Sequence, residues 1–250
     1  DDIKTITYDG KHVWLSNNSD VLLYDRPTLK QIDIPNDPEL TKCSMILMGN
    51  GSKENEIAKL NTDGLISRPF IFWPRRPSIL EKFLDTNKCK GYKDRTLNTI
   101  FIGNIENNVQ AKWRDDKKDW KDMIDLFMIT NGHTHVMSQE EYLQNMANSK
   151  FGLSFAGFGC KCNRDIELMA LGTVMLRTEG LNVDSYYETL IEGTHYINVN
   201  CKDDIKKIVE NVSEEKWEIM SKACREWYMR NCHSKNTFNI WMKAMMNDKM

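Results

Sequence analysis

The chain has 250 residues, of which 40% are hydrophobic and 28% charged, the composition of a soluble globular protein with one large core or two small ones. Its net charge of -2 gives no argument for nucleic-acid binding, and no apolar run approaches the roughly 18 residues of a membrane span. Seven cysteines without a regular framework favour reduced thiols, so we expect a cytoplasmic protein unless a signal or an anchor precedes Asp1.

Residues 1–92 are predicted to form the smaller of two α/β halves. Short apolar runs indicate strands at 3–8, 12–15, 21–24, 45–48 and 70–73, and two helices fit around 54–60 and 78–84. The periodicity breaks off within 87–93, where Gly91 lies among polar residues. We therefore place a domain boundary there and assign 93–250 to a second half.

The second half alternates strands with helices. Strand candidates lie at 99–102, 126–130, 151–155, 173–176 and 196–199. Ser138 and Glu141 have the spacing of a capping box at the start of a helix. A long helix at 213–230 is expected to bury one flank, made of Trp217, Met220, Ala223 and Trp227. The alternation favours a doubly wound parallel sheet, in which ligands lie at the carboxyl ends of the strands.

The segment 149–177 is the most informative part of this half, because it reads as strand, glycine loop, helix and strand. Asn163 is a predicted N-cap and Gly172 a predicted C′ residue of the helix. Arg164 then lies in the first turn, where unpaired amide groups and the helix dipole already favour an anion such as phosphate. Glu167, one turn later, can accept hydrogen bonds from vicinal hydroxyls such as those of a ribose. The two residues together suit a nucleotide diphosphate.

A simpler interpretation of Arg164 and Glu167 is an ordinary surface ion pair, because they have its spacing. The loop before them also matches neither the dinucleotide-binding fingerprint nor the P-loop motif.

A zinc site is a separate alternative, with Cys160, Cys162, His133 and His135 as ligands. Their spacing matches no standard finger or ribbon, and we predict no metal.

The segment resembles the signature of exostosin-type glycosyltransferases. The residues that carry the resemblance are Ser154, Gly157, Gly159, Arg164, Glu167 and Gly172. The chain departs from the family at Ala156, where a Pro- or Arg-containing loop is usual, and at Asn163, where a small hydroxyl residue is common. The resemblance implies the GT-B architecture, two Rossmann-like halves facing across a cleft, here with an abbreviated N-terminal half and C-terminal helices that pack back.

The resemblance also implies a nucleotide-sugar site, with UDP as the nucleotide. It places Arg164 near the diphosphate and Glu167 near the ribose. Less specifically, it extends to the strand that ends at Gly103 and to the basic helix start that follows, although Arg114 also fits a solvated helix face. The predicted donor-binding residues are Arg164, Glu167, Asn163, Gly157, Phe158, Gly159, Gly103, Asn104 and Arg114.

Sugar transfer from such a donor builds charge on the departing diphosphate and requires a base for the acceptor hydroxyl. No convincing D-x-D motif is present, so we expect a metal-independent reaction with no cofactor beyond the nucleotide-sugar co-substrate. If the reaction inverts the anomeric centre, the base should come from the first half. Asp20 is the preferred candidate and Asp9 the second, although turn chemistry explains both, Asp9 as part of an Asp-Gly hairpin.

The sequence thus predicts an inverting glycosyltransferase with a UDP-sugar donor, UDP-xylose being one candidate, and a glycan acceptor. It predicts neither a nucleic-acid partner nor a membrane span in this chain. One alternative is a non-catalytic module that binds a nucleotide or a glycan. A weaker one is a phosphotransferase or nucleotide hydrolase, which the missing P-loop disfavours.

Overall fold

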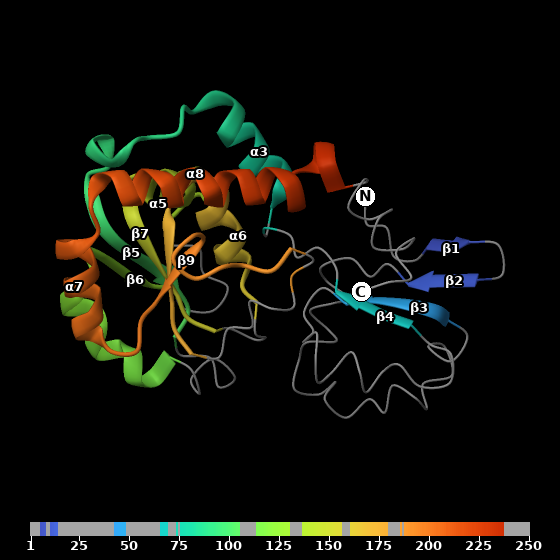
Figure 1. Cartoon of the computed structure of the whole chain (residues 1–250), viewed down its shortest axis with the longest axis horizontal. Helices are drawn as coiled ribbons and strands as arrows, with labels where there is room; N and C mark the ends of the chain where they lie inside the picture. Colours follow the sequence, from blue (N-terminus) through green and yellow to red (C-terminus); the bar gives the residue numbers. More distant parts are fainter. Residues whose placement is uncertain are drawn as a thin grey trace.

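The computed structural model describes Pro74, residues 76–105, 114–130, 137–156, 161–179, Tyr186 and residues 188–237, together with the backbone of four strands nearer the amino terminus. Those four strands form one sheet in the order β1-β2-β3-β4 (Figure 1). Their bounds are β1 Ile6–Tyr8, β2 Lys11–Trp14, β3 Cys43–Met48 and β4 Ile66–Pro69. β1 and β2 are antiparallel, and the other pairs are parallel.

Three of the predicted strands in this region are confirmed as β1, β2 and β3. β4 was not predicted, because Ile66–Pro69 contains one aliphatic residue followed by serine, arginine and proline and so lacks an apolar run. The predicted strands at 21–24 and 70–73 and the helix around 54–60 lie outside the described residues.

A second sheet contains five parallel strands in the order β6-β5-β7-β8-β9. They are β5 Leu97–Gly103, β6 Leu126–Ile129, β7 Ser149–Ser154, β8 Val174–Arg177 and β9 Tyr196–Asn198. All five strands predicted for the second half are thereby confirmed, as is the α/β class with a Rossmann-like sheet. β5 lies between β6 and β7, so the chain moves to one side of β5 and then to the other.

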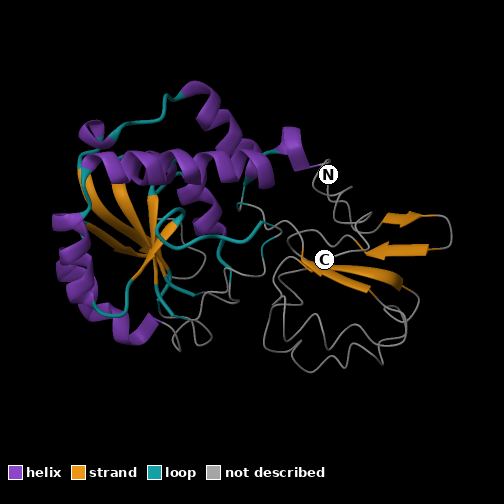
Figure 2. Ribbon diagram, viewed as in Figure 1, coloured by secondary structure: helices purple, strands orange, loops and turns teal. Residues whose placement is uncertain are grey.

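Helices cover both faces of the five-stranded sheet (Figure 2). The α-helices are α3 Pro77–Thr86, α5 Gln139–Ala147, α6 Asn163–Ala170, α7 Lys202–Asn211 and α8 Glu214–Asn231. Two 3-10 segments, η4 Tyr92–Asp94 and η5 Asp115–Met123, flank β5 in the chain. Among the described residues, no helix is both long enough and apolar enough to cross a membrane.

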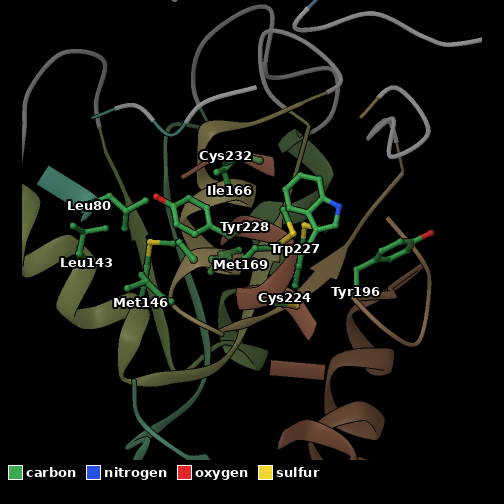
Figure 3. Packing of buried hydrophobic residues seen from close by; sticks show 14 of the residues in the cluster. Leu80, Leu143, Met146, Ile166, Met169, Tyr196, Cys224, Trp227, Tyr228 and Cys232 are labelled. Atoms are coloured by element: carbon green, nitrogen blue, oxygen red, sulfur yellow. The ribbon is translucent and has the colours of Figure 1, made fainter. Parts of the chain in front are cut away.

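Side chains of the central strands alternate between two hydrophobic clusters, one on each face of the sheet. On β5, Ile100 and Ile102 belong to the first cluster and Phe101 to the second. α3, α5, α6 and the second half of α8 contribute to the first cluster, part of which Figure 3 shows around Tyr228 and Trp227. Because both faces are covered, the strands read as continuous apolar runs in the sequence, which explains why all five could be predicted.

Two of the three predicted helix caps are confirmed. Ser138 and Glu141 form the predicted capping box of α5. Gly172 is confirmed as the C′ residue of α6: its φ is 66°, and its amide and that of Thr173 donate to the carbonyls of Met169 and Leu168. The N-cap prediction is wrong, because α6 begins at Asn163 and Cys162 is its N-cap.

α8 confirms the predicted long helix and most of its buried flank. Trp217, Met220 and Trp227 are buried, but Cys224 is buried in place of Ala223, which is partly exposed. α8 packs mainly on α6. α3 packs on α5, so this helix, which precedes the predicted boundary at 92/93, belongs to the core of the five-stranded sheet. The boundary itself stays a prediction.

Candidate functional site

The order of the strands defines where a ligand would enter. Because β6 and β7 lie on opposite sides of β5, the carboxyl ends of β5 and β7 mark the topological switch point of the sheet. Gly103 and Asn104 lie at the end of β5, and Phe155 and Ala156 follow β7. In open α/β sheets, ligands bind at this place.

Arg164 reaches the switch point from the first turn of α6. Its guanidinium donates to the carbonyl of Ile102 at 3.1 Å and to that of Phe155 at 3.2 Å, so it joins the ends of β5 and β7. The same group lies over the Phe101 ring, 4.7 Å from its centroid. Only 9% of the residue is exposed. Glu167 is only 3% exposed, so the interpretation of Arg164 and Glu167 as a surface ion pair is wrong.

Arg114 reaches the same place from the residue before η5. It donates to the carbonyls of Ala156 at 2.7 Å and Phe155 at 3.1 Å, and also to that of Asn104. Burial lowers the pKa of Arg114 to about 10, and the charge of Arg164 acts in the same direction. Arg114 is thus buried and still cationic at neutral pH, so the solvated-face interpretation is wrong.

The two guanidinium groups converge on one atom, the carbonyl oxygen of Phe155. Within the described part of the chain, their acceptors are carbonyl oxygens and, for Arg114 alone, also the Cys162 thiol at 4.0 Å; none is a carboxylate. An arginine has five N–H donors. For Arg164, the buried Nε has no partner among the described residues. Two like charges this close favour an anion that could accept their remaining donors.

Asp165 is the nearest buried acid, but it is engaged elsewhere. One of its oxygens accepts from the Ser154 hydroxyl and the other from the Cys162 amide at 3.1 Å. Burial raises the pKa of Asp165, while Arg164 and these hydrogen bonds oppose the rise. Burial also raises the pKa of the Cys162 thiol to about 11. Asp165 and Cys162 therefore fix the start of α6, which sets the position of Arg164.

Glu167 lies one turn further along α6. Its Oε2 accepts a hydrogen bond from the Tyr142 hydroxyl of α5 at 2.8 Å. Burial and the Glu167 charge raise the pKa of Tyr142 well above its ordinary value. The phenol is therefore a neutral donor and the carboxylate its acceptor.

The structure places part of the predicted site and leaves part untested. Arg114, Arg164, Gly103 and Asn104 meet at the switch point, and Asn163 and Glu167 lie on the same helix as Arg164. Gly157, Phe158, Gly159, Asp9 and Asp20 lie outside the described residues. The antiparallel pairing of β1 and β2 has Tyr8 opposite Lys11.

Sequence reasoning missed Tyr142 and Asp165. Asp165 carried a usable signal, since it is three residues after the N-cap Cys162 and its carboxylate accepts from the N-cap amide, as in a capping box. Tyr142 carried none, because its partner is 25 residues away on another helix. Tyr186 packs edge-on against Trp227 of α8, with ring centroids 5.2 Å apart.

Gly103 explains how Arg164 can lie across the end of β5. A Cβ at this position would lie 2.7 Å from Arg164 Nη1 and 3.1 Å from Phe101 Cζ. Gly103→Ala is therefore expected to displace the guanidinium. If UDP is the ligand, as the family resemblance implies, its affinity should fall about threefold to tenfold, with little change in the free energy of unfolding because the end of an arginine can move.

Calorimetric titration with UDP, alongside thermal unfolding, measures both effects. Gly91→Ala is the control, because a Cβ there meets only side-chain carboxylates, the nearer being Glu218 Oε1 at 3.0 Å. Equal UDP affinity in wild type and Gly103→Ala would show that the guanidinium position does not affect binding.

A metal centre has no support in the described ranges. There, no group of three or more His, Cys, Asp or Glu side chains is arranged to hold a metal ion. Cys160, His133 and His135, which the zinc alternative needs, lie outside them.

Comparison with known proteins adds little. No family model matches the sequence, and no curated protein does. Among solved structures, the crystal structure of TarM is similar, with a TM-score of 0.44 and 12% sequence identity. The likeness covers 97% of this chain but 48% of that one, so the chain spans about half the length of TarM. A similarity this weak carries no argument about activity.

Proposed function

We propose that this chain is a glycosyltransferase of GT-B type that transfers a sugar from a nucleotide diphosphate sugar to a glycan hydroxyl. The observation that carries the proposal is the meeting of Arg114 and Arg164 at the switch point between β5 and β7. Both are buried, both are held by backbone carbonyls, and Arg164 keeps a buried donor without a partner among the described residues. A diphosphate is the anion that suits two adjacent guanidinium groups.

The chemistry follows from this arrangement. When the bond between the sugar and the diphosphate breaks, negative charge builds on the leaving phosphate. Donors that are already fixed by the strand ends stabilise that charge without reorganising. Arg114 and Arg164 would in this way supply the stabilisation that a bound metal supplies in other enzymes. Glu167 would accept hydrogen bonds from the ribose.

The finer points of the function are proposals that the sequence carries. UDP is the proposed nucleotide, a pentose such as xylose one candidate sugar, and inversion the proposed stereochemistry. Asp20, or less favourably Asp9, would deprotonate the acceptor hydroxyl from the first half of the chain. The cytoplasm is the proposed compartment.

Two titrations and one turnover assay test the proposal. In calorimetry, UDP should bind at least about tenfold more tightly than uridine, because charge-assisted hydrogen bonds to the diphosphate contribute about 1.5–3 kcal/mol. Incubation with a panel of sugar nucleotides should release UDP from one donor, at the same rate with and without EDTA. Equal affinity for UDP and uridine would refute the diphosphate site.

The same experiments separate the alternatives. Tight UDP binding without transfer to any acceptor on a glycan array would identify the non-catalytic binding module. Magnesium-dependent release of inorganic phosphate would identify a nucleotide hydrolase.

A further inference from the structure

The hydrogen bond between Tyr142 and Glu167 joins two helices at the edge of the proposed nucleotide site. α5 and α6 both begin at the carboxyl edge of the sheet, since each follows a parallel strand. Tyr142 is in the second turn of α5, and Glu167 is one turn along α6 from Arg164. Side chains on a helix lean toward its amino terminus, so both lean toward the carboxyl edge of the sheet.

The bond restricts the carboxylate. A free glutamate rotates about three side-chain bonds, and its last torsion is broad. Tyr142 holds Oε2 at 2.8 Å, and Glu167 is 3% exposed. A carboxylate can accept about four hydrogen bonds, so the bond from Tyr142 does not compete with a ribose hydroxyl. It orients the group before any ligand arrives, which reduces the entropy lost on binding.

We propose that Tyr142 is a positioning residue that orients the Glu167 carboxylate toward the ribose and so makes the site selective for a ribonucleotide over a deoxyribonucleotide. This inference rests on the proposed function, because it takes Glu167 to meet the ribose. It assigns Tyr142 no part in bond breaking.

The preference of UDP over 2′-deoxy-UDP is the measurement that isolates this role. A missing hydroxyl leaves a carboxylate hydrogen bond unmade, which should weaken the binding of 2′-deoxy-UDP to the wild type about tenfold. Tyr142→Phe should reduce that preference to about twofold through weaker UDP binding, with the affinity for 2′-deoxy-UDP nearly unchanged. A merely structural role would lower both affinities by the same factor.

A second tyrosine offers a matched control. Tyr228 is buried in the hydrophobic cluster that also contains Leu143, the residue after Tyr142, and Ile166, the residue before Glu167. The Tyr228 hydroxyl has no hydrogen-bond partner among the described residues. Tyr228→Phe should leave the ribose preference as in the wild type. Glu167→Gln should also lower the preference to about twofold, because an amide oxygen accepts a weaker hydrogen bond than a carboxylate, and combining it with Tyr142→Phe should cause no further loss.

The outcomes separate the two proposals. A wild type that does not bind UDP overturns both. A wild type that binds UDP tightly, with an unchanged ribose preference in Tyr142→Phe, overturns only the role of Tyr142. If Tyr142→Phe lowers the melting temperature too far to titrate, the Glu167→Gln result decides. An unchanged ribose preference in Glu167→Gln would mean that the Glu167 carboxylate does not contact the ribose, and this would overturn the inference.

Discussion

Arg164→Lys is expected to weaken UDP binding about 10- to 100-fold, the effect of losing one or two charge-assisted hydrogen bonds. Lysine keeps the charge but replaces a rigid planar fork with a point charge. Arg164 uses two nitrogens for the carbonyls of Ile102 and Phe155, whereas the single nitrogen of lysine would have to reach both carbonyls and a phosphate from one point. Arg114→Lys should act in the same direction, because Arg114 shares the Phe155 carbonyl. Calorimetric titration of UDP measures both.

Arg95 provides a closely matched control at the opposite edge of the sheet. Like Arg164 it is buried, donates to two backbone carbonyls, those of Ser149 at the start of β7 and of Leu171, the C-cap of α6, and lies 4.7 Å from the centroid of an aromatic ring, that of Trp217. Burial lowers the pKa of Arg95 to about 10, so it also remains cationic at neutral pH. Its position before β5 keeps it away from the switch point.

Arg95→Lys should therefore lose about as much unfolding free energy as Arg164→Lys, about 1–3 kcal/mol. Its UDP affinity should change by no more than about twofold. All titrations are made at a temperature where circular dichroism shows each variant folded. If Arg95→Lys weakens UDP binding as much as Arg164→Lys does, the arginines act through the fold alone, and the diphosphate site is refuted.

Gly152→Ala is expected to be the most disruptive small substitution in the five-stranded sheet, with a loss of about 1–3 kcal/mol of unfolding free energy from overpacking. Gly152 lies in the middle of β7, under α6. A Cβ there would overlap Leu168 Cδ2 and would lie 2.9 Å from Cδ1 and 3.1 Å from Cγ. Leu168 is fully buried, so it has nowhere to move.

A double-mutant cycle measures whether this contact is the cause. Leu168→Ala alone should cost about 2–5 kcal/mol, because it leaves a cavity. With both substitutions, the new methyl group at 152 occupies part of that cavity. The loss should then be smaller than the sum of the single losses by about 0.5–3 kcal/mol. Denaturant unfolding measures all four proteins, and Gly91→Ala again serves as the glycine control. Additive losses would show that α6 does not press on β7 at this point.

The close packing at Gly152 also links the fold to the candidate site. α6 carries Arg164 and Glu167, so any shift of this helix away from β7 moves both residues. A substitution at Gly152 is therefore expected to change the position of Arg164 at the switch point, although Gly152 itself lies in the middle of β7.

Much of the five-stranded half could be predicted, because its signals are local. Strands buried on both faces appear as apolar runs, and Ser138, Glu141 and Gly172 act on backbone groups within a few residues. β4 escaped prediction because its residues carry no such run. The cap of α6 was misassigned by one residue because Cys162 is an unusual N-cap, whereas Asn163 is a common one.

The sequence by itself determined the order of the elements in the second half and singled out Arg114, Arg164 and Glu167 as residues that suit a nucleotide diphosphate. It left open whether the three were surface charges, because helical spacing is the same for a solvated pair and a buried one. Only the tertiary structure decided that. The reversal of strand order at β5 brings together two arginines that are 50 positions apart, and the packing of α5 on α6 brings Tyr142 to Glu167. Such contacts depend on the side of β5 to which each crossover connection leads. Local sequence patterns do not predict that side, because they reflect only residues that are close together in the chain.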